Sequence, residues 1–280
     1  MSKDPIPKKA LGQHWLNDEH SLLSMLAAAR VVSTDTVLEI GPGLGSLTRL
    51  LVAAAARVVA VEYDIILANN LATRVSATNL QVFHHDILTF DLTTLPPDYK
   101  VVANIPYYLT SKLVRVLSES TNQPAAVALL VQKEVAERLA AKPGDLSILG
   151  VTAQFYWDIH LGAVVGAELF TPPPKVDSQI VIMERRPDPF AALATGLTAG
   201  QAGAASGGAA APFDVKAFFR VVKAGFGARR KTLLNSLGGG LHLDKAATAD
   251  LLARAGIAPG LRAQNLSMQD WYRLYLAYTA

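Results

Sequence analysis

The tetrapeptide NIPY, residues 104–107, combines an amide, a rigid turn and an aromatic ring directly after the apolar run VVA. The run is typical of a buried strand, and proline cannot donate to a strand ladder, so we expect the strand to end there. The Asn104 side-chain oxygen can accept hydrogen bonds from a ring amine. Pro106 fixes the turn, and Tyr107 offers a face for stacking on a base. These residue types suit a reaction at the amino group of a nucleic-acid base.

A glycine loop and three acidic residues predict the second ligand. The loop EIGPGLGSLT follows one predicted strand and opens a helix, with Gly41 and Gly43 in its turn. Glu39 beside the loop disfavours a pyrophosphate and favours a cationic ligand. Glu62 ends the next strand, where an acidic residue accepts hydrogen bonds from ribose hydroxyls, and Asp86 follows the third, where it can accept from an adenine amine. We therefore expect S-adenosylmethionine, a cationic nucleoside without phosphate, as the cofactor.

The two predicted ligands together indicate methyl transfer to a base amine. The lone pair of such an amine is delocalised into the ring, so the nitrogen is a poor nucleophile. The Asn104 oxygen and a nearby backbone carbonyl would accept its two N–H groups and favour a pyramidal nitrogen. Because a sulfonium is already an activated methyl donor, catalysis would rest on positioning and electrostatics rather than on a strong base.

The elements that must position these residues follow an α/β pattern. Helix-like stretches at 45–55, 64–75 and 109–119 lie between apolar, β-branched runs, which predicts a Rossmann-like, doubly wound, mostly parallel sheet. After residue 145 the stretches SILGVTAQFYWDIHLGAVV and SQIVIMERR read as strands without room for crossover helices, which predicts an antiparallel edge. The five parallel strands are predicted at 36–40, 57–62, 80–84, 100–104 and 126–132.

Composition divides the chain into three parts. We expect a catalytic domain over residues 1–186, an Ala/Gly-rich linker or insertion over 187–212, and a helical RNA-binding domain over 213–280. Between Asp214 and Lys231 lie six basic residues and one acidic residue, a local charge of +5 in a chain of net charge +3. Three phenylalanines interrupt this basic run, a mixture that favours a nucleic-acid surface. The caps predicted for the helices of the third part are Asp214, Asp244, Ser267 and Gly256.

Composition also excludes several classes of protein. The 280 residues are 51% hydrophobic, which excludes a mostly disordered chain. The absence of cysteine excludes disulfides, a thiol nucleophile and thiolate metal sites, and the six histidines show no metal-ligand spacing, so we expect no metal. We find no apolar run that would span a bilayer and no signal peptide, and we expect a cytoplasmic protein.

Nearly the whole chain outside 187–212 resembles the KsgA family of small-subunit ribosomal RNA adenine dimethyltransferases. The resemblance rests on ordered motifs, which together are far more specific than any one alone. They are LGQHWL, EIGPGLGSLT, VEYD, HDIL, NIPYYLTS, LLVQKEVAERLAAKPGDLS, FTPPPKVDS, GFGARRKTLLNSL and RAQNLS.

The resemblance implies a role for each matching residue. Asn104 to Tyr107 would hold the target adenine, with Phe170 of FTPPPKVDS stacked on its other face. Basic residues of the helical tail would hold RNA. The reaction implied is double methylation at N6 of two adjacent adenines near the 3′ end of small-subunit RNA, within a pre-ribosomal particle, and we expect a monomer. The residues implied at the cofactor are His14, Leu16, Gly41, Gly43, Glu62, Asp86 and Asn104, and those implied at RNA are Arg229, Arg230 and Lys231.

Three alternatives are open. The Erm group, which methylates large-subunit RNA, shares the glycine loop and the N-[IL]-P-[FY] motif, although GFGARRKTLLNSL and PPPKVDS favour KsgA. A non-catalytic RNA-binding assembly factor, or a relative like the mitochondrial transcription factor B group, would keep the fold without the chemistry. A DNA adenine methyltransferase is disfavoured because D-P-P-Y or N-P-P-Y is absent.

Overall fold

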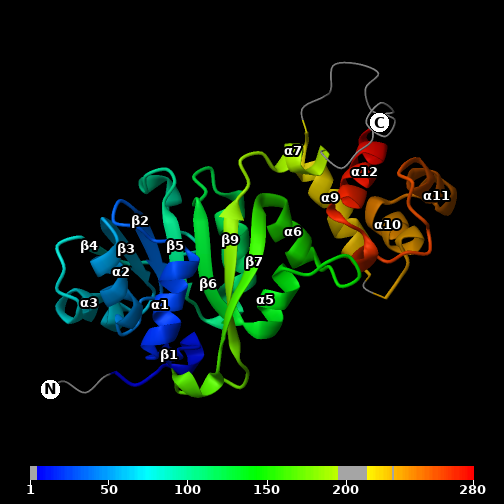
Figure 1. Cartoon of the computed structure of the whole chain (residues 1–280). Helices are drawn as coiled ribbons and strands as arrows, with labels where there is room; N and C mark the ends of the chain where they lie inside the picture. The colour runs from blue at the N-terminus through cyan, green and yellow to red at the C-terminus, as the bar shows by residue number, and fades with distance from the viewer. Residues whose placement is uncertain (1–4, 195–212, 229) are drawn as a thin grey trace. The chain divides into compact units, whose positions relative to one another are not determined.

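The computed structural model describes residues 5–194, 213–228 and 230–280, and the chain divides into two compact units. The first unit comprises Met1–Glu137 and Asp158–Arg185, and the second comprises Arg138–Trp157 and Arg186–Ala280. Figure 1 colours the chain from its N-terminus to its C-terminus.

The first unit is built on a seven-stranded sheet with the order β4-β3-β2-β5-β6-β9-β7. The pairs β2/β3, β2/β5, β3/β4 and β5/β6 are parallel, and β9 pairs antiparallel with β6. This sheet confirms the predicted fold class, including the antiparallel element near the edge. The strands are β2 (Thr36–Ile40), β3 (Arg57–Glu62), β4 (Leu80–His84), β5 (Lys100–Asn104), β6 (Ala126–Gln132), β7 (Trp157–Val165) and β9 (Ser178–Arg185).

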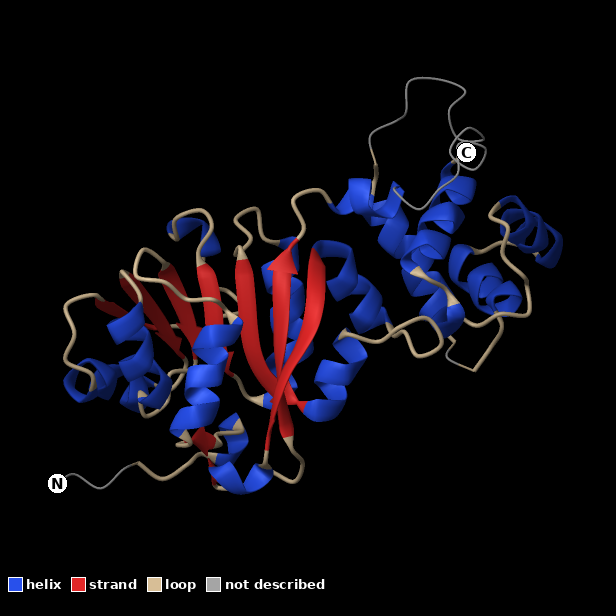
Figure 2. Ribbon diagram, viewed as in Figure 1, coloured by secondary structure: helices blue, strands red, loops and turns tan. Residues whose placement is uncertain are grey.

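Helices flank this sheet on both faces, as Figure 2 shows. On one face, Leu22 and Met25 of α1 and Leu51 of α2 pack with sheet residues such as Val58 and Val102 in one buried cluster. A separate two-stranded sheet pairs β1 (Trp15–Leu16) antiparallel with β8 (Phe170–Thr171). The helices are α1 (Glu19–Ala28), α2 (Ser46–Ala54), α3 (Ile65–Arg74), α4 (Thr110–Glu119) and α5 (Lys133–Leu139).

The second unit is helical and has its own core. Phe218 and Val222 of α9 pack with Leu237 of α10 and Trp271 of α12 in one buried cluster. The predicted N-caps are confirmed, since the side chains of Asp214, Asp244 and Ser267 accept from backbone amides at the starts of α9, α11 and α12. The helices are α6 (Ile148–Tyr156), α7 (Pro189–Ala194), α9 (Val215–Phe226), α10 (Leu233–Leu241), α11 (Lys245–Arg254) and α12 (Met268–Thr279).

The stretch after residue 145 differs from the prediction. Residues predicted as a strand form helix α6, which ends where β7 begins. The Ser147 side chain caps α6 by accepting from the Gly150 amide, and Val151 and Phe155 of α6 lie in the same buried cluster as α9 residues. This packing also explains why residues 138–157 group with the C-terminal helices rather than with the sheet.

The predicted linker lies mostly outside the described residues. Residues 189–194 of it form helix α7, while residues 195–212 and Arg229 fall in the parts that the structure does not describe. The boundaries of the linker therefore stay a prediction. None of the helices in the described ranges is long and apolar enough to cross a membrane.

Candidate active site

A cavity of about 500 Å³ lies in the first unit at the carboxyl ends of four neighbouring parallel strands. The strand order reverses between β2 and β5, and ligands of open α/β sheets bind where this reversal occurs. The cavity is lined by residues that follow β2, β3, β4 and β5 and by the N-terminal segment 10–16. The topology therefore gathers residues that lie far apart in the sequence.

The glycine loop after β2 forms one wall of this cavity. Gly41 and Gly43 have φ angles of 66° and 57°, a left-handed conformation that favours glycine. A Cβ added to Gly41 would meet no atom within 4 Å, whereas one added to Gly43 would lie 3.3 Å from the Trp15 ring. Gly41 thus leaves space in the cavity wall that a ligand can approach closely.

Glu62 ends β3 with its carboxylate held in place by the backbone. Its Oε2 accepts from the Gly43 amide at 3.1 Å, and its Oε1 accepts from the Asp64 amide at 2.8 Å. Burial raises the pKa of Glu62, and the Asp64 charge adds to this, while the backbone hydrogen bonds lower it. Each carboxylate oxygen keeps a lone pair beyond these bonds. Glu62 can therefore accept hydrogen bonds from a ligand's hydroxyl groups.

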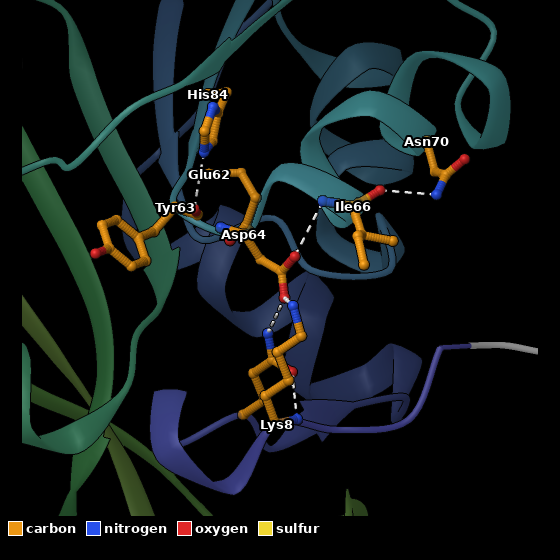
Figure 3. Close-up of polar contacts among 8 residues, drawn as sticks. Lys8, Glu62, Tyr63, Asp64, Ile66, Asn70 and His84 are labelled. Carbon is orange, nitrogen blue, oxygen red and sulfur yellow. Dashed lines mark hydrogen bonds and ion pairs between the residues drawn. The ribbon is translucent and has the colours of Figure 1, made fainter.

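Asp64 fastens the N-terminal segment beside Glu62, as Figure 3 shows. Its Oδ1 accepts from the Ile66 amide at 3.0 Å at the start of α3, and its Oδ2 pairs with Lys8 Nζ at 2.7 Å. Gln13 Nε2 donates to the same Oδ2 at 3.4 Å. Burial works to raise the pKa of Asp64, but the Lys8 and Ile66 hydrogen bonds outweigh it and the pKa is lowered. The ionised Asp64 thus anchors the segment that carries His14 and Leu16.

Asp86 lies in the cavity wall just beyond β4. Its Oδ1 accepts from the Leu88 amide at 2.9 Å, which fixes the direction of the side chain. The carboxylate is partly exposed and can accept from a further donor. This geometry is compatible with the predicted contact to an adenine amine.

Glu39 is the most unusual carboxyl in the cavity. It is 1% exposed, and neither of its oxygens has the geometry of a hydrogen bond to a described residue, although the Thr48 hydroxyl lies close enough to interact with the carboxyl. Burial raises its pKa to about 8, and the nearby Glu62 charge adds to this, while the Thr48 hydroxyl opposes it. A buried polar group without a partner costs free energy. Glu39 is therefore suited to a cationic group of a bound ligand.

The NIPY turn completes the cavity after β5. Asn104 Nδ2 donates to the His14 carbonyl oxygen at 3.3 Å, and Asn104 Oδ1 has no partner in the described ranges. The Tyr107 hydroxyl lies 2.7 Å from Ser178 Oγ, and the rings of His14 and Tyr107 are nearly parallel, with an interplanar angle of 17° and centroids 6.1 Å apart. The amide oxygen and a held aromatic ring are thus presented in one wall.

Phe170 lies elsewhere. It is 3% exposed in β8, pairs with Leu16 of β1, and belongs to the buried cluster with Leu22 and Met25. It does not line the cavity, so this arrangement offers no support for its predicted stacking on the base. Leu16 is equally buried but does line the cavity. Pairing of two short strands decides both positions, and no local sequence signal indicates such pairing.

The remaining predicted residues are distributed as follows. His14, Gly41, Gly43, Pro106 and Tyr107 all line the cavity. Of the predicted RNA-binding residues, Arg230 and Lys231 are exposed in the second unit, and Arg229 is outside the described residues. Among the residues that the structure describes, no group of three or more histidine or acidic side chains is placed to hold a metal ion.

Sequence reasoning gave no role to Lys8, Gln13 or Ser178. Ser178 ends the motif FTPPPKVDS, so its motif was found while its hydrogen bond to Tyr107 was not. Gln13 lies in the motif LGQHWL and Lys8 lies outside every motif, but neither contact carries a sequence signal, because their common partner Asp64 lies more than fifty positions away.

The cavity fits S-adenosylmethionine on three observations. The unpartnered carboxyl of Glu39 suits a cation, and the open space at Gly41 lets a ligand approach the backbone. The backbone-held carboxylate of Glu62 suits the hydroxyls of a ribose.

Comparisons with known proteins agree with this geometry. The family model for ribosomal RNA adenine dimethylase matches residues 7–195. A curated relative from Dehalococcoides mccartyi, named ribosomal RNA small subunit methyltransferase A, is 41% identical over 97% of this chain and 88% of its own length. A dimethyladenosine transferase from Plasmodium falciparum has a similar structure, with a TM-score of 0.76 and 24% identity over 95% of this chain and 98% of that one. The 23S rRNA methyltransferase ErmE has a TM-score of 0.68 and 26% identity over 95% and 100%.

Proposed function

The chain belongs to the ribosomal RNA adenine dimethylase family, and we propose that it dimethylates N6 of two adjacent adenines near the 3′ end of small-subunit ribosomal RNA. Its methyl donor is S-adenosylmethionine. The observation that carries the proposal is the Asn104 amide in the cavity wall, whose nitrogen donates to the His14 backbone while its oxygen has no hydrogen-bond partner among the described residues.

Asn104 and the turn after it would orient the adenine amine. With Nδ2 engaged by His14, the Oδ1 atom is the group that can accept an N–H from the base. The sulfonium of the donor supplies an activated methyl group. Tyr107 would support the base by stacking, which is worth about 1–3 kcal/mol, and its bond to Ser178 keeps the ring from turning away. Because the attacking nitrogen needs only orientation, the chain's task is positioning.

The acidic residues would hold the donor. Glu62 would accept from the ribose hydroxyls, Asp86 from the adenine amine, and Glu39 would lie near the positive charge. The N-terminal segment would close over the donor through His14 and Leu16, held by the ion pair of Lys8 and Asp64. Phe170 is left out of this assignment, since it packs in the core.

The predicted cations Arg229, Arg230 and Lys231 would contact RNA phosphates. We further propose that the substrate is a pre-ribosomal particle, that the protein works as a monomer, and that it acts in the cytoplasm. The proposal of a pre-ribosomal particle rests on the type of substrate that a small-subunit RNA methyltransferase requires.

Large-subunit RNA is the competing substrate. The matches to ErmE and to the curated small-subunit relative cover almost the same share of this chain, but the chain is 26% identical to ErmE and 41% identical to the small-subunit relative. The motif GFGARRKTLLNSL also favours the small subunit. Loss of catalysis is disfavoured, because the donor-binding acids and the NIPY turn line one cavity.

One experiment separates these possibilities. The protein is incubated with labelled S-adenosylmethionine and with unmethylated small or large subunits, and the modified nucleotides are mapped. We expect two adjacent N6-dimethyladenosines in small-subunit RNA alone. The variant Asn104→Ala, prepared in parallel, controls for contaminating methyltransferases. A label confined to large-subunit RNA, or none at all, would overturn the proposal.

A further inference from the structure

The second unit contains a groove between helices α9 and α10, apart from the cavity of the first unit. Gly240 lets the two helices approach closely, because a Cβ there would lie 2.6 Å from Ala224. We call this the α9–α10 groove. Its lining includes Lys216, Arg220, Lys223, Ser236, Gly239 and Gly240.

Three cations follow one edge of the groove. Lys216, Arg220 and Lys223 are spaced by four and three positions, which places them on one face of α9. All three are exposed, and none has an ion-pair partner in the part of the chain that the structure describes. The nearest acid in sequence, Asp214, is engaged as the cap of α9 by the Lys216 and Ala217 amides. The edge is therefore an uncompensated row of positive charge.

Ser236 gives the groove a feature that a solvated basic face lacks. It is 5% exposed, and its hydroxyl has no hydrogen-bond partner among the described residues. Buried hydroxyls are normally hydrogen-bonded, so an unpartnered one calls for an explanation. Ser236 is part of the groove lining although its hydroxyl oxygen is itself buried, so a ligand oxygen in the groove would satisfy this hydroxyl after a small movement of the side chain.

The lining also indicates the class of ligand. Of the described residues in the groove, none is acidic and none is aromatic, so it offers charge and hydrogen bonds but no surface for stacking a base. A Cβ on Gly239 would meet nothing within 4 Å, so the groove is open to a bulky group at this residue. These properties suit phosphate groups rather than bases.

We propose that the α9–α10 groove binds consecutive phosphates of an RNA backbone, with Lys216, Arg220 and Lys223 as the cations and the Ser236 hydroxyl as a donor. This set is separate from the predicted Arg229, Arg230 and Lys231. The choice of RNA over other polyanions rests on the proposed function. Such a site would hold RNA without regard to its sequence, since phosphate contacts position and base contacts specify.

The first test compares two single substitutions with the same change in charge. Arg220→Gln removes a groove cation, and Lys245→Gln removes an exposed cation at the start of α11, outside the groove. Affinity for deproteinised small-subunit RNA is measured over a range of salt concentrations. We expect Arg220→Gln to weaken binding about five- to eight-fold near 0.1 M salt and to flatten the salt dependence by roughly 0.7–0.9 log units. Lys245→Gln should leave the slope unchanged.

The second test addresses the Ser236 hydroxyl and the open space at Gly239. Ser236→Ala should weaken RNA binding several-fold without lowering the melting temperature, because it removes a buried group that has no partner. Gly239→Glu should weaken binding at least ten-fold by placing a carboxylate in the groove, whereas Gly239→Ala should leave binding unchanged.

The outcomes separate this inference from the proposed function. If wild type binds RNA but does not methylate subunits, the proposed function fails while the groove is still tested by binding. An unchanged salt dependence of RNA affinity in Arg220→Gln, together with unchanged RNA affinity in folded Gly239→Glu, would overturn the proposal that the groove binds RNA. Binding of polyglutamate, a polyanion without phosphate, is measured on the same variants. If Arg220→Gln and Gly239→Glu weaken polyglutamate binding but leave RNA binding normal, the assignment of the groove to RNA is overturned.

Discussion

Replacing Glu39 with glutamine converts a buried, unpartnered carboxyl into a neutral amide of the same shape. Burial raises the pKa of Glu39 from its ordinary value of 4.5 to about 8. The folded chain therefore binds this proton more tightly than the unfolded chain does. The free energy of unfolding is unaffected by this group below pH 4.5, falls as pH rises from 4.5 to about 8, and then levels off.

The size of the effect follows from the same values. The difference between a pKa of 4.5 in the unfolded chain and of about 8 in the folded chain lowers the free energy of unfolding by at most about 5 kcal/mol at high pH. At pH 7 the loss would be at most about 3 kcal/mol. Glutamine carries no charge at any of these values, so Glu39→Gln should unfold at nearly the same denaturant concentration as wild type at pH 5. It should be several kcal/mol more stable than wild type at pH 9.

Urea unfolding at pH 5, 7 and 9, without ligand, measures this difference. Glu137→Gln serves as a matched control for the Glu-to-Gln change, because Glu137 lies exposed on α5. Parallel pH profiles for wild type and Glu39→Gln would refute the reasoning.

A second readout uses the cofactor itself. A cationic ligand favours ionised Glu39, so binding of S-adenosylmethionine near pH 7 should release up to one proton. Calorimetry in buffers of different ionisation enthalpy would detect this release in wild type and its loss in Glu39→Gln. Equal proton release in both proteins would assign the proton to another group.

Three further substitutions test the site. Asn104→Ala should lower single-turnover methylation on the order of 10²–10³-fold, by analogy with the loss of one preorganised polar group, with a smaller effect on RNA affinity; a near-normal rate would reduce Asn104 to a turn residue. Glu62→Ala should weaken S-adenosylmethionine binding by about 1.5–3 kcal/mol in calorimetry, and unchanged affinity in the folded variant would remove its ribose contact. Phe170→Leu should lower the melting temperature but preserve turnover, and turnover lost at an unchanged melting temperature would show that Phe170 reaches the base after all.

Local patterns in the sequence were sufficient for the parallel half of the sheet. The strands at 36–40, 57–62, 80–84, 100–104 and 126–132 have the predicted bounds, because each is a short β-branched run closed by a turn or a helix start. The same regularity located the glycine loop, Glu62, Asp86 and Asn104, since in a parallel sheet the carboxyl ends of successive strands meet at one edge.

Tertiary packing decided what lies outside these patterns. The stretch 148–156 is rich in β-branched and aromatic residues, yet it is helical because a cap at Ser147 and burial against α9 outweigh its propensity. Phe170 is buried through the pairing of β8 with β1, and Lys8 forms an ion pair with Asp64, which lies far from it in the sequence. The burial of the Ser236 hydroxyl without a partner among the described residues is likewise a property of the folded chain. The sequence by itself determined the residue types and the order of the elements, whereas burial and long-range pairing, which depend on the whole folded chain, decided which of those side chains meet.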